Sequence, residues 1–402
     1  MSANWIPWRS EARIMGLIGL AHMTSHFFHL IIAPLFPWLR IEFGYSFTEL
    51  GFLMTMFFIV SGIFQAAAGF VVDRFGAGIT LLGGLLCLSL CALCLGLSNS
   101  YAWLIVGVCF GGLGNSVFHP VDFSLLNSRI SVSRLGPAYS VHGLTGNIGW
   151  ALAPVFLVGI ATPFGWRAAL LCAAVLPLVV IGMLLLNRDV IRNIKPDLDD
   201  RDPMPNKPVS TDLAFLRDPK IWWCFSFFAL VSVAIGATQN FAPSIFSNVY
   251  ALDTQAATMS IIIMMLTSAV GMVMGGWLVS RSPRLEQNIT LALVMATASA
   301  VLVGVAIVPS QIALLLMGVM GFGIGLSGPS RDMLIRTVTP EGATGRVYGV
   351  VYSGLDVGLA IAPALFGGML DRGYFAAVFY GVAACLCLSI VTARRATKIA
   401  AG

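Results

Sequence analysis

The stretch Asn193-Ile-Lys-Pro-Asp-Leu-Asp-Asp-Arg-Asp-Pro-Met-Pro205 divides this chain of 402 residues, because it lies in the only long polar segment, residues 187–220. Its charged residues and prolines are typical neither of a membrane helix nor of a packed core. We therefore expect a linker over residues 191–219. The N-terminal half would be residues 1–190 and the C-terminal half residues 220–402.

The composition on both sides of this linker is that of a membrane protein. Hydrophobic residues make up 58% of the chain and charged residues 10%, and the mean hydropathy is +0.89. A soluble domain carries about 25% charged residues, and a spanning helix needs about 20 consecutive apolar residues. Each half contains six such segments: 14–39, 48–72, 78–97, 102–127, 136–160 and 166–186, then 221–248, 256–280, 288–308, 311–336, 345–369 and 373–393. We expect an all-α membrane protein of twelve transmembrane helices.

The basic residues predict how the chain is oriented. Of the 23 Lys and Arg residues, only Arg40, Arg167 and Arg372 lie in gaps on the side opposite the N-terminus, apart from Arg331 inside a helix. Cytoplasmic loops are enriched in Lys and Arg. We therefore expect both termini and the linker in the cytoplasm of a multi-pass inner-membrane protein. Because the basic residues are scattered through the gaps, the net charge of +5 does not indicate a nucleic-acid partner.

Two smaller features complete this class assignment. All eight cysteines lie inside apolar segments, so we interpret them as small packing residues and not as a disulfide or zinc framework. The N-terminus lacks the layout of a cleavable signal peptide, so we expect the first helix to be retained.

The two halves also repeat each other. A shift of 209 residues places helices 4–5 on helices 10–11 without a gap. The least trivial matches are two prolines and a tyrosine: Pro120 on Pro329, Pro154 on Pro363 and Tyr139 on Tyr348. Parallel repeats about an axis along the membrane normal place a binding site at the midplane, between the halves.

The loop after the second segment reads Gly69-Phe-Val-Val-Asp73-Arg74-Phe-Gly76. It resembles the Gly-x-x-x-Asp-Arg-x-Gly signature between helices 2 and 3 of the major facilitator superfamily. The resemblance implies the twelve-helix fold of that superfamily and a gating role for Gly69, Asp73, Arg74 and Gly76. In this chain Ala77-Gly78 replaces the basic pair that follows in the family.

A narrower resemblance covers about residues 20–156. Leu20-Ala21-His22, the run Gly112-Leu-Gly-Asn-Ser-Val-Phe-His119-Pro120 and the run Gly146-Asn-Ile-Gly149 are similar to the fosmidomycin-resistance branch. The resemblance implies proton-driven export of small, often anionic compounds. The chain departs from the branch where Val121 follows His-Pro, with Asp122 one place later.

All five histidines lie in the N-terminal half. His22, His26 and His29 are spaced i, i+4, i+7 and so share one face of helix 1, while His119 and Asp122 are spaced i, i+3 in helix 4. Histidine titrates near neutral pH, so these groups are candidates for proton coupling and solute binding. We expect coupling at His22, His26, His119 and Asp122. Solute binding is expected at the same four residues together with His29 and His142. The alternative is that each histidine only hydrogen-bonds a neighbouring helix.

Helix 10 carries the candidate solute anchor. Arg331 and Asp332 lie within the membrane segment, where a charge costs at least about 2.5–3.5 kcal/mol and needs a partner or a function. A guanidinium binds carboxylate or phosphonate through paired hydrogen bonds. We therefore expect both residues in the solute site, the alternative being a structural salt bridge.

Three further polar residues in the membrane are candidates. Asp356 in helix 11 is interpreted as a second titrating carboxylate or as a polar helix contact. Gln239 and Asn240 precede Phe241-Ala-Pro243 in helix 7, where we expect a helix break that lines the cavity and supplies hydrogen bonds to the solute.

Together these patterns favour a monomeric, proton-coupled secondary transporter of a small organic anion or antibiotic-like solute, with membrane lipid as its other partner. Export by proton antiport is favoured over uptake of a carboxylate by symport. A transition metal or metal chelate bound by the helix-1 histidines is a further alternative, as is a membrane sensor. No cofactor or resident metal is expected. The absence of a nucleotide-binding loop and of a His-Glu-x-x-His arrangement argues against an enzyme.

Overall fold

The computed structural model describes residues 8–131, 134–192, 217–281, 284–338 and 344–401, and the described part of the chain is helical. Twelve helical segments are long and apolar enough to cross a membrane, as the sequence predicts. The elements of the first half are α1 (Trp8–Phe28), η1 (Ala33–Leu35), α2 (Phe36–Phe43), α3 (Phe47–Phe75), α4 (Ala77–Gly96), α5 (Tyr101–Asn115), α6 (Phe118–Arg129), α7 (Leu135–Phe164), α8 (Trp166–Leu186) and α9 (Arg188–Ile191). Those of the second half are α10 (Pro219–Val249), α11 (Thr254–Arg281), α12 (Leu285–Val305), α13 (Ser310–Val338), α14 (Thr344–Asp371) and α15 (Ala377–Ala401).

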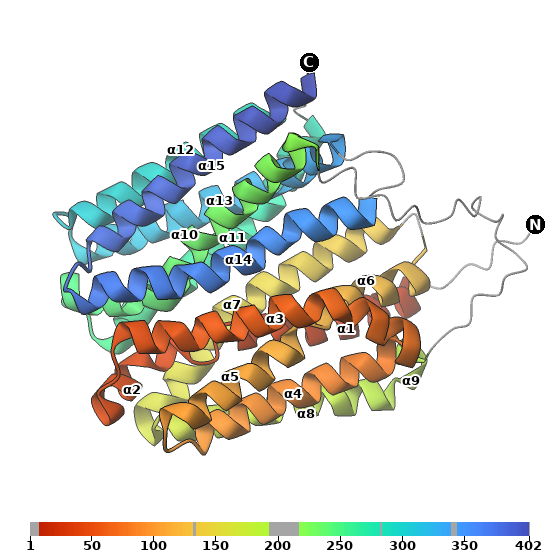
Figure 1. Ribbon diagram of the computed structural model, residues 1–402, viewed down its shortest axis with the longest axis horizontal. Helices are drawn as coiled ribbons and strands as arrows, with labels where there is room; N and C mark the ends of the chain where they lie inside the picture. Colours follow the sequence, from red (N-terminus) through yellow and green to blue (C-terminus); the bar gives the residue numbers. More distant parts are fainter. Residues whose placement is uncertain (1–7, 132–133, 193–216, 282–283, 339–343, 402) are drawn as a thin grey trace, which may run out of the picture.

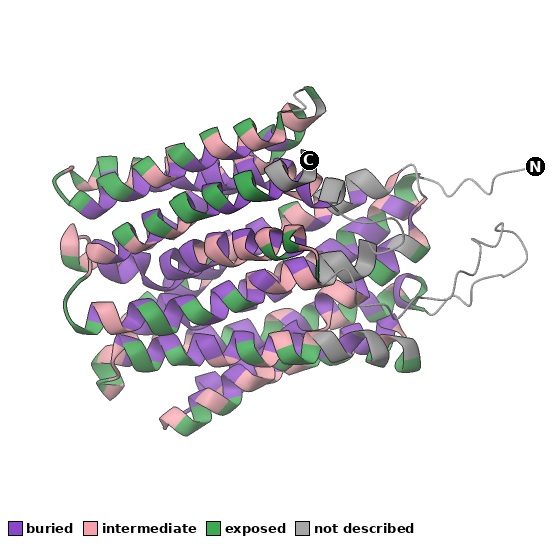
Figure 2. Ribbon diagram, turned by 45° about the horizontal axis from the view of Figure 1, so that its top comes forward, coloured by how far each residue is buried: buried purple, intermediate pink, exposed green. Residues whose placement is uncertain are grey.

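The helices run side by side as two bundles, with α1–α9 in the lower part of Figure 1 and α10–α15 in the upper part. The linker predicted over residues 191–219 lies mostly outside the described residues. We call the end of the bundle that carries residues 29–46 and 372–376 the loop end. The opposite end, where α1 begins and α15 finishes, is called the terminal end. Figure 2 shows exposed residues along the outer faces of the helices and buried ones between them.

Many of these outward-facing residues are large and apolar, for example Ile79 and Leu291, which are 66% and 72% exposed. An outer surface of this kind suits the hydrocarbon core of a bilayer, which offers no hydrogen bonds to polar groups.

Two membrane segments predicted as continuous helices are broken. The first segment leaves α-helical geometry after Phe28 and continues through η1 and α2. Pro34 lies in η1 and cannot donate a backbone hydrogen bond. The fourth segment breaks between α5 and α6, three residues before Pro120, for the same reason.

The break predicted at Pro243 is wrong, because α10 continues through it to Val249. Membrane helices tolerate an internal proline where neighbouring helices and polar side chains satisfy the freed backbone groups. Here Asn240 Nδ2 donates to the Gly236 carbonyl one turn earlier, at 2.7 Å, so part of this polar side chain is committed to its own helix.

The two halves meet along α3 and α14 and along α7 and α11. At the first contact a Cβ added to Gly51 would overlap the carbonyl of Pro363, and one added to Gly367 would lie 2.7 Å from the Phe47 carbonyl. Thr55 Oγ1 donates across the same contact to the Ala360 carbonyl at 2.6 Å. Glycine thus permits the close backbone approach of small-residue membrane interfaces.

The loop end is closed by a carboxylate that crosses between the halves. Asp371, at the end of α14, accepts hydrogen bonds from the backbone N–H of Phe47 at 2.6 Å, and from the N–H and hydroxyl of Thr48 at 2.8 and 2.5 Å. The first backbone N–H groups of a helix have no partner within the helix. Asp371 therefore caps α3, which belongs to the other half, and Arg40 lies 3.7 Å from the same carboxylate.

Candidate functional site

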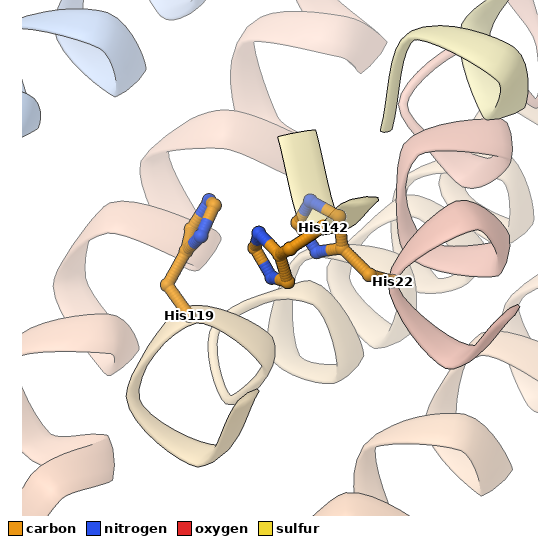
Figure 3. Close-up of side chains that lie close together, drawn as sticks. All are labelled: His22, His119 and His142. Carbon is orange, nitrogen blue, oxygen red and sulfur yellow. The ribbon is translucent and has the colours of Figure 1, made fainter. Parts of the chain in front are cut away.

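The N-terminal half gathers all five histidines into one cluster, which contains a buried carboxylate. His22, His26 and His29 come from α1 and its end, His119 and Asp122 from α6, and His142 from α7. Figure 3 shows the rings of His22, His119 and His142 converging from these three helices. The structure thus brings together the candidate residues of helices 1 and 4 with His142 of helix 5, which the sequence also indicated.

Asp122 lies at the centre of this histidine cluster and is fully buried. Its Oδ2 is 3.1 Å from Nε2 of His142, within hydrogen-bonding distance. The same oxygen is 3.2 Å from Nδ1 of His22, close enough for an ion pair but not aligned as a hydrogen bond. An ionised carboxylate only accepts hydrogen bonds, so His142 must donate through Nε2 whenever Asp122 is charged.

The imidazole rings form a continuous contact path. His22 stacks on His142 with centroids 3.5 Å apart, and lies 5.4 Å from His119 and 4.4 Å from His26. His26 in turn stacks on His29 at 4.7 Å. Close helix packing makes this possible, because a Cβ on Gly146 would lie 2.8 Å from the His26 ring.

Several polar atoms of the cluster are buried without a hydrogen-bond partner among the described residues: Nδ1 of His22, both ring nitrogens of His26, and Oδ1 of Asp122. Buried polar atoms are nearly always hydrogen-bonded, so such exceptions call for an explanation, often a role in function. These atoms are the ones available to a proton, a water molecule or a solute.

His29 differs from the other four histidines, because both of its ring nitrogens are engaged. Trp150 Nε1 donates to Nδ1 at 3.2 Å, and Nε2 is 2.8 Å from Oδ1 of Asn115. Asn115 Oδ1 also accepts from Ser25 Oγ at 2.5 Å, and its Nδ2 donates to Ser61 Oγ at 2.9 Å. Solute binding by His29, expected from its place on helix 1, would require breaking one of these bonds.

Sequence alone gave little indication of this network. Asn115 lies in the run Gly112–Pro120 and is uncharged, so the sequence does not mark it as a candidate. Trp150 resembles any other aromatic residue of a membrane helix. The available signal was that amide and indole groups inside a membrane segment need partners.

Arg331 lies in the C-terminal half, away from the histidine cluster. Its Nε donates to Oδ1 of Asp332 at 2.9 Å, and its guanidinium stands over the ring of Phe228 at 4.3 Å. Tyr352 donates its hydroxyl to the same Asp332 oxygen at 3.2 Å. A narrow cavity of about 10 Å³ adjoins Arg331, between α10, α13 and α15, with Trp223 among its apolar lining. The salt bridge to Asp332 that the sequence left as an alternative is therefore present.

The other predicted polar residues lie at separate positions. Asp356 is buried at the contact between α14 and α3, where Gln65 Nε2 donates to it at 3.4 Å. Gln239 and Asn240 are buried in α10. Gln239 Nε2 lies 3.7 Å from the sulfur of Met265, and Oδ1 of Asn240 has no partner among the described residues.

The predicted gating residues lie at the terminal end of α3. Gly76 ends the helix with φ of +89°, a conformation that glycine adopts without strain. The Arg74 side chain is exposed. The surroundings of Gly69 and the side chain of Asp73 lie outside the described part of the structure.

A metal could be held by a different set of histidines from the one predicted. In the helix-1 set, both ring nitrogens of His29 are hydrogen-bonded, so metal binding by this set would require His29 to give up one of these bonds. Ring nitrogens of His22, His119 and His142 lie within 4.8 Å of one another. Three histidines can bind a transition-metal ion, and Zn–N bonds of about 2.0–2.1 Å would require these nitrogens to move closer together.

The twelve-span architecture, the repeated halves and the buried polar site between helices are features of a membrane transporter. A family model of the Major Facilitator Superfamily matches residues 18–363. The chain belongs to this superfamily, whose members are transporters and not enzymes.

Relatives within the superfamily are distant. The chain is 25% identical over 281 residues to the Fosmidomycin resistance protein of Escherichia coli (strain K12), covering 68% of this chain and 67% of that protein. It is 24% identical over 352 residues to a Probable L-galactonate transporter of the same organism, covering 83% and 77%. A solved structure of a bacterial homologue of the human lysosomal transporter Spinster, inward-facing and unoccupied, superposes with a TM-score of 0.75 at 14% identity, covering 98% of this chain and 97% of that one.

Proposed function

We propose that this chain is a proton-coupled secondary active transporter that moves a small organic, anionic solute by alternating access, with export by proton antiport favoured. Both termini would face the cytoplasm from the inner membrane, and the monomer would be the working unit. The observation that carries the proposal is Asp122, fully buried between His22 and His142.

A carboxylate in this position suits reversible protonation. A charge inside the membrane is costly unless it is paired or functional, and imidazole exchanges protons near neutral pH. Adding one proton to the group formed by Asp122, His22 and His142 removes its net charge. We therefore propose that protonation and deprotonation of this group alternate with solute binding.

The closed loop end supports alternating access. The hydrogen bonds of Asp371 join the halves at the loop end, and that of Thr55 joins them closer to mid-height. With the terminal end cytoplasmic, a closed loop end would make this conformation inward-facing. Rocking of the halves would break the Asp371 contacts and expose the site to the other side.

The solute site is proposed between the halves. His26 offers two ring nitrogens without partners, and Asn240 offers one carbonyl oxygen, among the described residues. Arg331 remains the candidate anchor for an anion, and a solute would share its guanidinium with Asp332 or displace Asp332 from it. The name of the L-galactonate relative supports a carboxylate solute, and that of the fosmidomycin relative supports export.

The test uses purified protein in proteoliposomes, with fosmidomycin and L-galactonate as probes and a pH-sensitive dye inside. We expect Asp122→Asn to abolish pH-gradient-driven accumulation while exchange of solute for solute persists, because exchange needs no net proton transfer. Asp253→Asn, which changes a loop-end carboxylate, is the matched control. Full pH-driven accumulation by Asp122→Asn would overturn the coupling assignment.

The same liposomes separate export from uptake. Solute entry raises the internal pH in an antiporter, because protons leave as solute enters, and lowers it in a symporter. The sign does not depend on how the protein is inserted. A fall in internal pH would replace antiport with symport of a carboxylate.

One observation favours a second candidate, transport of a transition metal or its chelate, namely the ring nitrogens of His22, His119 and His142 within 4.8 Å of one another. The two candidates are alternatives, because they use the same side chains. Liposomes that contain a zinc-sensitive dye would fill with Zn²⁺ under this second candidate, and His119→Gln would stop the entry. Under the proton candidate the wild type admits no Zn²⁺.

A further inference from the structure

The hydrogen bonds of His29 fix its chemical form. The Trp150 indole can only donate a hydrogen bond, and it donates to Nδ1 of His29. Nδ1 therefore presents a lone pair, which places the ring proton on Nε2. That nitrogen then donates to Oδ1 of Asn115 at 2.8 Å, an oxygen that has no proton to give. The geometry thus specifies the neutral ring with hydrogen on Nε2.

A second proton on His29 would conflict with this geometry. It would have to bind Nδ1, where two donors would then face each other. The remaining neighbours offer no compensation. The ring lies against Phe57, Phe58 and His26, and its contacts in the described structure include no carboxylate.

Asn115 extends this arrangement across the N-terminal half. Its carbonyl accepts from Ser25 as well as His29, and its amide donates to Ser61, which is fully buried in α3. Helices α1, α3, α5 and α7 are thereby tied together one turn from His26. The network leaves His29 little freedom to turn away from Trp150.

His29 also lies at the boundary between the cluster and the closed loop end. Beyond it the chain continues with residues 30–36, which are all apolar and buried. His29 is thus the last titratable side chain of helix 1 before this apolar segment, and it is in contact with His26.

We propose that Trp150 is a positioning residue that holds His29 neutral in one tautomer, so that exchangeable protons are confined to the deeper cluster of Asp122 and the other four histidines. The proposal rests on the proton-coupled function proposed above. His29 then lies at the boundary of the proton site and does not carry protons itself. Trp150 influences how many protons move per solute through its bond to His29, without touching the carboxylate.

The first experiment observes His29 directly. Wild-type protein is labelled with ¹⁵N-histidine, and the His29 resonances are assigned by their loss in His29→Gln. We expect a protonated Nε2 and an unprotonated Nδ1 at every pH between about 5 and 8, the range in which free histidine changes charge. A protonated Nδ1, or a resonance that titrates in this range, would overturn the proposal. This measurement needs no solute.

The second experiment measures protons moved per solute in the proteoliposomes described above. Trp150→Phe keeps an aromatic ring and removes the donor. We expect its proton-to-solute ratio to rise above the wild-type value and to vary with pH, and Trp150→Phe combined with His29→Gln to restore the wild-type ratio. Trp103→Phe, at an exposed position on α5, is the matched control and should match the wild type.

The outcomes separate the two proposals. A ratio unchanged in Trp150→Phe, or equally altered in the double variant, contradicts the role of Trp150 and leaves proton coupling standing. A wild type that moves solute without protons contradicts the proposed function, whereas the ¹⁵N result still decides the state of His29. Should Trp150→Phe not fold, that spectrum of the wild type remains the deciding measurement.

Discussion

The Asp371 contact at the loop end allows a quantitative test of the conformational equilibrium. Asp371→Ala removes three hydrogen bonds to the first turn of α3. It also removes the ion pair between Asp371 and Arg40. These contacts join the two halves, so their loss destabilises only the conformation in which the loop end is closed. The effect is therefore expected in the balance between conformations more than in the folding of either half.

The expected magnitude follows from the kind of contact. Removal of a helix-capping side chain costs about 0.5–2 kcal/mol. The Asp371 side chain is 25% exposed and its ion pair with Arg40 is long, at 3.7 Å, so the ion pair adds little. A shift of about 1–2 kcal/mol follows, and since about 1.4 kcal/mol is a factor of ten, the open population should rise roughly 5- to 30-fold.

The assay is the labelling rate of a cysteine placed behind the contact. Phe36 is fully buried and faces Phe241 of the other half, with ring centroids 6.0 Å apart. Phe36→Cys in purified protein should react with a polar thiol reagent at a rate proportional to the open population. The protein without this substitution measures the background from the native cysteines, of which Cys172 and Cys387 are exposed.

The matched control is Asp253→Ala. Asp253 also caps a helix at the loop end, accepting from the N–H groups of Gln255 and Ala256 at 2.9 and 3.0 Å, but its helix α11 belongs to its own half. Asp371→Ala should accelerate labelling and Asp253→Ala should not. Equal rates in the two variants would refute the reasoning, because the cap would then have no effect specific to the closed conformation.

Three further predictions concern close packing and buried polar groups. Gly51→Val should also accelerate labelling of Phe36→Cys, since a side chain there overlaps the Pro363 carbonyl; an unchanged rate would show that α3 and α14 can separate without opening the loop end. Asn115→Leu should lower the melting temperature, because Ser25, His29 and Ser61 lose their partner and buried polar groups left unpaired cost about 1–3 kcal/mol each. Calorimetry in detergent measures this temperature, and an unchanged value would contradict the prediction. Arg331→Ala should abolish uptake of L-galactonate or fosmidomycin with the melting temperature lowered only slightly; retained flux would leave Arg331 as a partner of Asp332 alone.

The number of membrane spans was predictable because it depends on the length and hydrophobicity of each segment of the chain. Residues 187–220 are too polar to cross a bilayer, and the apolar segments on either side have the length that a bilayer requires. The shared face of His22, His26 and His29 followed equally well from the helical period. The break expected at Pro243 failed because its neighbours, not its own sequence, decide whether a membrane helix continues through proline.

The composition of the candidate site was only partly predictable. The sequence indicated Asp122 and all five histidines as candidates, but it did not show that His142 bonds to Asp122 or that His29 is bonded through both ring nitrogens. These assignments depend on the rotation and height of α7 against α1, which pack closely at Gly146. Hydrogen bonds need donor–acceptor distances of about 2.7–3.2 Å, so periodicity cannot identify them.

The sequence by itself determined that this protein is a twelve-helix membrane transporter in two repeated halves. The lengths of the hydrophobic segments, the positions of the charges and the internal repeat can all be identified from the order of residues alone. Only the tertiary structure decided which side chains share a hydrogen bond. It paired Arg331 with Asp332, engaged both nitrogens of His29, and placed Asp371 of one half on the first turn of a helix in the other. The physical reason is range: hydrophobic transfer acts on whole segments, whereas hydrogen bonds form only after helices from distant parts of the chain have packed together.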